Sequence, residues 1–327
     1  SQSVEFSGGT NDGGGDPSET SCGGTKTSDG DCEQDIRGSG TLNFGPVDID
    51  GTNTRAVVSQ GNQNPNTPIV STLVIDPGND DSNTAFVLDD TDLEVKGDLT
   101  NNGNFIAGGK RIFFNGGVSQ TITSSTGITF FELEIDNTNS QGVQVAPGAD
   151  IEVAEQLEII QGALSFQSGA PDTELRINNE LRMTGGSLET ANADVVLVSS
   201  GTTEGYISYV DAGGDGTLDG SIVGDVIKQR ELDGSENWYF LTSPAGTSTN
   251  DTFDDLLRQG RTGTNSLWLQ GFSGANAETS NPAVSNVRLY DDSQATTDDD
   301  AGWVSINSAF DEMESGRGYA VFAFSND

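Results

Sequence analysis

Two stretches of the sequence repeat one another at an offset of 24 residues: IEVAEQLEIIQGAL at 151–164 and LRINNELRMTGGSL at 175–188. Each contains two short segments in which apolar residues alternate with polar ones, followed by a glycine and a leucine. Alternation with a period of two is typical of a β-strand with one buried face. Strands this short cannot bury an apolar face alone, so successive copies must stack to form a core. The repeat therefore predicts a stack of parallel β-coils.

The same pattern continues toward the N-terminus. An earlier copy, with Leu93, Leu99 and Phe105 at the apolar positions, fits the template, and further alternating segments occupy 112–114, 121–123, 131–135 and 143–145. Asn, Asp and Gly lie between these segments, where corners need positive φ angles or side chains that bond to the backbone. We predict an all-β protein with a right-handed parallel β-solenoid, or β-helix, over about 70–205. A long β-sandwich with irregular hairpins is the alternative, because strands this short fit both folds.

Aromatic residues distinguish the two ends of the chain. Phe113, Phe114, Phe130 and Phe131 are expected to stack inside the solenoid. All three tryptophans and all five tyrosines follow residue 205, among strand candidates at 223–230, 238–242, 267–270, 287–290, 303–306 and 318–324. These strands predict an antiparallel β-sandwich over 221–327, with Trp238, Trp268 and Trp303 in its core rather than in a carbohydrate platform. An acidic linker, 206–220, is expected between the two domains, and a Gly/Asp-rich arm with the first strands over 1–69.

The composition excludes whole classes of function. The 327 residues include 51 Asp and Glu against 14 Lys and Arg, which gives a net charge of −37 and opposes binding to nucleic acid or anionic lipid. Histidine is absent, which excludes Ser-His-Asp and Cys-His nucleophiles, imidazole acid–base chemistry and histidine metal sites. No apolar run approaches the roughly 20 residues of a membrane helix. We therefore expect neither nucleic acid nor insertion into a membrane.

The two cysteines, Cys22 and Cys32, bracket a polar loop, CGGTKTSDGDC. A disulfide between them is predicted, which implies an oxidising, extracytoplasmic setting. Two free thiols are the alternative.

One loop is a candidate metal site. In DAGGDGTLDG, residues 211–220, Asp211, Asp215 and Asp219 recur at every fourth position of a Gly-rich segment that can bend around a hard cation. An EF-hand is rejected, because Gly213 and Ile222 occupy its third and twelfth ligand positions. Calcium bound by these oxygen ligands is the prediction, and a solvated acidic linker is the alternative.

The stretch from DLTNNGNFIAGGKRIFFNGG to DIEVAEQLEIIQGAL, 98–164, resembles the repeat region of large secreted surface proteins of Bacteroidetes and related phyla. The later segments GDVIKQRELDGSENWYFLTSP, LWLQGF, VRLYDD and GWVSINSAFDEMESGRGYAVF are similar to the domain that follows such repeats. The resemblance covers roughly 95–325 and brings no catalytic residue with it. It implies type IX secretion with a C-terminal sorting domain, and we expect that domain to be cleaved off or absent, since none is found before Asp327.

These features predict a secreted, non-enzymatic structural protein at the cell surface. We expect it to build a filament, sheath or layer by self-association into a homopolymer, because solenoid ends and sandwich edges are unpaired β-templates. The first alternative is a carbohydrate-binding adhesin module that contacts surface glycans. The second is a polysaccharide lyase or hydrolase that uses paired carboxylates on a β-helix.

Overall fold

The computed structural model describes residues 4–7, 25–26, 32–37, 43–50, 54–59, 68–76, 84–169, 172–200, 203–216, 219–229, 237–242, 253, 285–294, 302–314 and 317–323. β-Strands form nearly all the regular structure of this part of the chain. The chain divides into two units, Ser1–Arg230 and Glu231–Asp327, each with its own apolar core. The first unit is the predicted parallel β-solenoid, and the second contains an antiparallel sheet.

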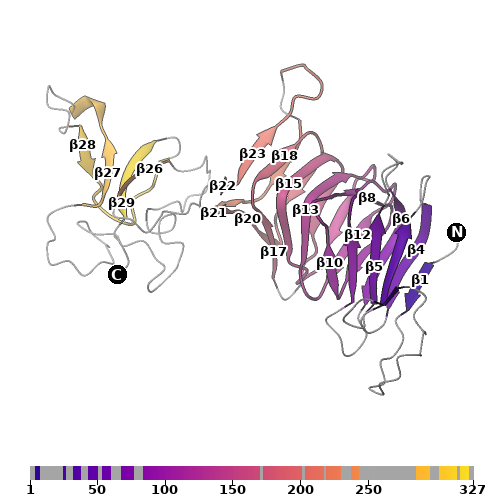
Figure 1. The fold of residues 1–327 in the computed structure, drawn as a ribbon. Helices are drawn as coiled ribbons and strands as arrows, with labels where there is room; N and C mark the ends of the chain where they lie inside the picture. The colour runs from indigo at the N-terminus through magenta and orange to yellow at the C-terminus, as the bar shows by residue number, and fades with distance from the viewer. Residues whose placement is uncertain are drawn as a thin grey trace. The chain divides into compact units, whose positions relative to one another are not determined.

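The first face of the solenoid is a continuous parallel ladder (Figure 1), in which each strand pairs with the next. In ladder order its strands are the first halves of β4 (Asn43–Asp50) and β6 (Ile69–Asp76), then β8 (Leu93–Val95), β11 (Arg111–Phe114), β13 (Ile128–Asp136), β15 (Ile151–Gln161), β18 (Glu180–Met183) and β23 (Tyr206–Tyr209). The ladder of this face therefore begins at β4 and ends at β23.

Two further faces complete the coils. The second face holds β1 (Val4–Ser7), the second halves of β4 and β6, and then β9 (Leu99–Asn101), β12 (Gln120–Ser124), β14 (Val143–Val145), β16 (Ala163–Phe166), β19 (Ser187–Glu189) and β24 (Ser221–Val223). The third face holds β3 (Cys32–Arg37), β5 (Thr54–Ser59), β7 (Ala85–Leu88), β10 (Asn104–Ile106), the first halves of β13 and β15, and then β17 (Thr173–Ile177), β20 (Ala193–Leu197) and β25 (Ile227–Lys228). Short antiparallel pairings involve β2 (Thr25–Lys26) with β3, and β21 (Ser199–Ser200) with β22 (Thr203–Glu204).

The long strands β13 and β15 turn a corner of the solenoid. Residues 128–130 pair with 151–153 on the third face, and residues 132–135 pair with 156–159 on the first. The register shifts between Phe130 and Glu132, and a bulge of this kind bends a strand. One strand can therefore serve two faces.

Apolar side chains of successive strands form columns in the interior. Paired positions of the first face hold Leu93, Ile112, Leu133, Leu157 and Leu181, none of them more than 1% exposed. The polar residues that alternate with them point outward, as expected for a strand. This column accounts for the alternation in the sequence.

The predicted 24-residue offset is confirmed. Leu157 pairs with Leu181, and Leu164 pairs with Leu188. The earlier copy was assigned to the wrong face, because Leu93 belongs to the column of Leu157 and not to that of Ile151. The error arises because every face carries the same short alternation.

A phenylalanine ladder lies in the core, although its members differ from those predicted. The rings of Phe86 and Phe105 lie 5.9 Å apart, and those of Phe105 and Phe130 lie 5.6 Å apart. Phe114 is buried as predicted, whereas Phe113 occupies an outward position on β11 and Phe131 is only partly buried at the bulge.

The solenoid extends beyond the predicted range of 70–205 at both ends. Within the predicted arm, β1, β4 and the strands β3 and β5 pair in parallel as solenoid strands do. β23 lies in the predicted linker 206–220, and β24 and β25 lie in the predicted sandwich, yet all three pair with solenoid strands. The acidic segment 211–220 looks like a linker between domains, but it is a loop between β23 and β24 of one coil.

The second unit contains a four-stranded antiparallel sheet in the order β26 (Asn237–Thr242), β29 (Gly318–Ala323), β27 (Val287–Tyr290) and β28 (Trp303–Ser305), with a 3-10 turn, η2 (Asp292–Gln294), after β27. One face of the sheet packs with Phe253, Ala309 and Met313 into a buried cluster that includes Tyr319 and Val321. The predicted antiparallel strands at these positions are confirmed, and the one predicted at 267–270 lies outside the described residues.

Candidate functional sites

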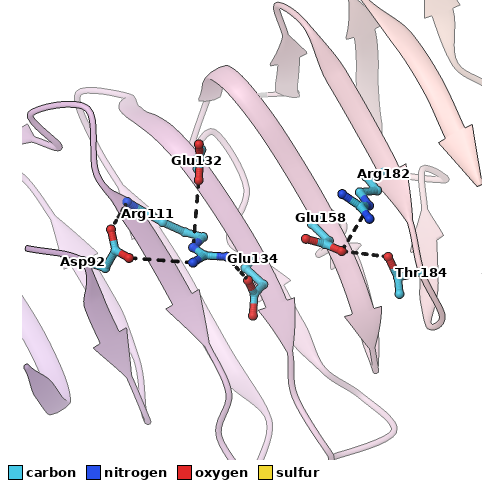
Figure 2. Close-up of polar contacts among 7 residues, drawn as sticks. All are labelled: Asp92, Arg111, Glu132, Glu134, Glu158, Arg182 and Thr184. Carbon is cyan, nitrogen blue, oxygen red and sulfur yellow. Dashed lines mark hydrogen bonds and ion pairs between the residues drawn. The ribbon is translucent and has the colours of Figure 1, made fainter. Parts of the chain in front are cut away.

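Outward side chains on the first face form a charged cluster around Arg111 of β11 (Figure 2). The Arg111 Nη1 lies 2.9 Å from Glu134 Oε2. Its Nη2 and Nε lie 3.8 Å from Asp92 Oδ2 and 3.9 Å from Glu132 Oε2. The guanidinium also lies over the Phe113 ring, 4.5 Å from its centroid. One cation thus serves three carboxylates that come from neighbouring coils.

Glu134 is the most buried carboxylate of this cluster, with 8% of the residue exposed. Burial raises its pKa above the usual range because water no longer solvates the carboxylate, and nearby Glu158 and Asp136 raise the pKa further. Arg111 acts in the opposite direction through its charge and its hydrogen bond, without cancelling the effect of burial. The charged form of Glu134 is therefore disfavoured in the folded protein.

Glu158 occupies the position on β15 that pairs with Glu134 on β13. Its Oε1 accepts a hydrogen bond of 2.8 Å from Thr184 Oγ1 and lies 3.4 Å from Arg182 Nε. The two glutamates thus use arginines from different coils, and neither lines the groove on the third face. This arrangement holds coils together and presents no carboxylate pair to a cleft.

An open groove of about 480 Å³ crosses the third face at the starts of β13 and β15. Its lining includes Ile106, Glu152, Glu174 and Arg176. The carboxylates there are engaged with the protein itself: Glu152 Oε1 accepts a 2.7 Å hydrogen bond from Asn178 Nδ2, and Glu174 Oε1 lies 2.9 Å from Arg176 Nη1.

Several aspartates bind the backbone of the next coil. Asp92 Oδ1 accepts a 3.0 Å hydrogen bond from the Arg111 amide, and Asp98 Oδ1 accepts one of 2.8 Å from the Thr121 amide. Asp150 does the same for the Glu174 amide at 2.9 Å. Each of these aspartates directly precedes the first apolar residue of a strand. This pattern was visible in the sequence but was missed, and it gives part of the acidic excess a structural role.

The predicted calcium loop lies between β23 and β24. Asp211 Oδ2 and Oδ1 accept hydrogen bonds from the Gly216 amide at 2.7 Å and the Asp215 amide at 3.1 Å. Asp219 Oδ2 accepts bonds from the Ala212 and Gly213 amides at 2.8 and 3.3 Å. Asp211 and Asp219 thus close the loop on its own backbone.

Nowhere in the described part of the chain do three Asp, Glu, Cys or His side chains gather as metal ligands. Calcium binding by Asp211, Asp215 and Asp219 stays a prediction. Cys22 lies outside the described residues and Cys32 begins β3, so the predicted disulfide also stays a prediction.

The tryptophans are placed differently from the prediction. Trp238 and Trp303 lie on the sheet face opposite the buried cluster, so their assignment to a sandwich core is wrong, and Trp268 lies outside the described residues. Tyr319 and Phe253 fill the core instead, with ring centroids 5.0 Å apart. The sequence pattern could not show which side of the sheet is buried, because both faces of this sheet carry large apolar side chains.

In comparison with known proteins, no family model, no curated protein and no solved structure matches the chain. Among the described residues, no helix has the length and apolar character that crossing a membrane requires.

Proposed function

We propose that this chain is a secreted structural protein that joins end to end with other copies to build a filament, sheath or layer at the cell surface. The observation that carries the proposal is the ladder of the second face, which keeps one strand direction from β1, through the second halves of β4 and β6, to β24. Among the described strands, β1 and β24 each pair with a strand of this ladder on one side only. Unpaired edges of this kind are templates for another strand.

The last coil also exposes apolar side chains that earlier coils bury. Ile207 continues the column of Leu181 and is 37% exposed, whereas Leu181 is fully buried. Tyr209 continues the column of Met183 in the same way. Ile222 of β24 continues the column of Leu188 and is only partly buried. Together they form an apolar end that a further coil would cover.

The first coil of a second copy supplies such a cover. Because all strands of the face are parallel, β1 of one copy can pair with β24 of another and continue the ladder. This contact is head to tail, so it does not close and instead produces an open chain of copies. The net charge of −37 opposes the contact at low ionic strength, and salt reduces this repulsion.

Sedimentation velocity of the full chain tests this proposal. We expect association that grows with protein concentration and with NaCl, and that is lost in Ile207→Lys. Val118→Lys is the matched control, because Val118 is a 61% exposed apolar residue in the turn before β12, away from the last coil. A monomer at every concentration and salt, or equal association of the two variants, would overturn the proposal.

A further inference from the structure

The four-stranded sheet of the second unit has a second apolar face. Side chains alternate along each strand, so the face opposite the buried cluster carries the other half of the residues. We define the aromatic face by the residues found there: Trp238, Phe240, Arg288, Tyr290, Trp303 and Phe322. Trp238 is 39% exposed, Tyr290 44% and Phe240 68%. An exposed apolar patch on a folded domain commonly marks a binding surface.

The rings of the aromatic face hold one another in fixed orientations. Trp303 lies 5.3 Å from Tyr290 and 5.9 Å from Phe240, measured between ring centroids. Tyr290 also covers Gly302, where an added Cβ would come within 2.5 Å of the ring. A surface held in this way loses little side-chain entropy when a ligand binds.

Arg288 lies between the aromatic groups. It pairs in register with Ala320 on β29 and with Ser305 on β28, and its guanidinium Cζ lies 5.4 Å from the Trp238 ring centroid. Its Nε is buried and has no hydrogen-bond partner. In the part of the chain that the structure describes, no carboxylate forms an ion pair with Arg288. No described carboxylate therefore neutralises the guanidinium charge, and an acceptor on a ligand would pair with it favourably.

We propose that the aromatic face binds a polysaccharide. The rings would contact the apolar C–H faces of pyranose units, and Arg288 would donate to a sugar hydroxyl, ring oxygen or uronate carboxylate. This inference is independent of the end-to-end association proposed above, since it uses a different surface and a different unit.

Charge and symmetry argue against the other occupants of such a face. Two copies meeting through it would bring two Arg288 side chains together without acceptors. Single-stranded nucleic acid also stacks on aromatic rings beside arginine, but the net charge of −37 repels a polyanion, and for the same reason it favours a neutral polysaccharide over a uronate polymer. A peptide strand would need a free sheet edge, whereas the centre of this face lies over the inner strands β29 and β27.

Titration of the full chain with oligosaccharides, followed by tryptophan fluorescence and calorimetry, tests the proposal. One arm uses a neutral glucan hexasaccharide, and the other uses an oligogalacturonate of equal length. Binding in either arm, weakened at least about tenfold in Trp238→Ala and in Arg288→Met, is the expected result. The preferred arm identifies whether a hydroxyl or a carboxylate accepts from Arg288.

Two control variants test whether any exposed aromatic ring, or any arginine, has the same effect on binding as the residues of the aromatic face. Phe310→Ala removes a 65% exposed ring outside the sheet, and Arg317→Met removes an arginine that pairs with Glu314 at 2.8 Å. Both should bind as the unchanged protein does. Absence of binding in both arms, equal losses in the controls, or preference for a single-stranded oligonucleotide would overturn the proposal. Arg288→Met changes no residue of the buried cluster, so it remains informative if Trp238→Ala fails to fold.

Discussion

At Glu134 two electrostatic effects oppose one another. Burial disfavours the carboxylate, and the Arg111 guanidinium favours it, with burial the larger effect. The folded protein therefore binds the Glu134 proton more tightly than the unfolded chain does. The contribution to stability is complete below the usual glutamate pKa of about 4.3 and is lost as pH rises through the raised pKa of the folded state.

Glu134→Gln should remove the loss of stability that Glu134 causes as pH rises. We expect the melting temperature of the variant, relative to the unchanged protein, to increase from about pH 4 to about pH 7, because Gln carries no charge to desolvate. Differential scanning calorimetry across this range measures the change. Glu132→Gln is the control. It also removes one negative charge beside Arg111, but the Glu132 side chain is more exposed than that of Glu134. The same response in both variants would contradict the account of Glu134.

Gly186 tests the corner between two coils. Its φ is +56°, and an added Cβ would lie 2.4 Å from the Gly162 carbonyl oxygen. We expect Gly186→Ala to lower the free energy of unfolding by about 1–3 kcal/mol through strain and overpacking. Gly214→Ala is the control, because Gly214 also has a positive φ but has open space around it. Urea unfolding should show the smaller loss for Gly214→Ala, and equal losses would show that close packing at the corner is not the cause.

At the scale of single elements, β12 shows a polar residue used within the core. The Gln120 side chain is fully buried, donates to the Val95 and Gly97 carbonyls at 2.9 and 2.7 Å, and accepts from the Gly116 amide at 2.9 Å and from Asn137 Nδ2 at 2.7 Å. All four bonds of the amide are formed, so one side chain connects three segments of the chain.

Replacing Gln120 with Leu should be strongly destabilising. The change leaves buried carbonyl and amide groups without partners, each costing about 1–3 kcal/mol. Gln144→Leu on the paired strand β14 is the control, because Gln144 points outward and is only partly buried; its effect should stay within about 0.5 kcal/mol. Guanidinium unfolding measures both. Equal tolerance of the two changes would mean that the buried network does not stabilise β12.

Strand positions and the repeat offset were predictable because apolar alternation is a local property. The face to which a strand belongs was not, since Leu93 and Ile151 have the same neighbours in sequence but lie in different columns. The Arg111 cluster was also beyond prediction, because its carboxylates come from coils 19 to 23 residues away along the chain. The exposure of Trp238 depends on which face of its sheet the core covers, and alternation does not specify that.

At the scale of the whole molecule, the net charge of −37 is the dominant long-range effect. Repulsion among carboxylates weakens as the Debye length falls from about 10 Å at 0.1 M salt to about 3 Å at 1 M. We expect the melting temperature to rise over this range of NaCl, and a fall would contradict the account.

Calcium at matched ionic strength tests the loop of Asp211, Asp215 and Asp219 separately. A further rise in melting temperature that disappears in Asp219→Asn would support the predicted site. The same rise in Asp219→Asn would assign it to general screening. Asp194→Asn is a control that removes an exposed carboxylate of β20.

Cryo-electron microscopy of the concentrated full chain at high salt tests end-to-end association most directly. The account predicts chains of copies in which β24 of one copy lies about 4.8 Å from β1 of the next, in parallel register. Separate particles under all conditions, or copies joined through the sides of their solenoids, would contradict it.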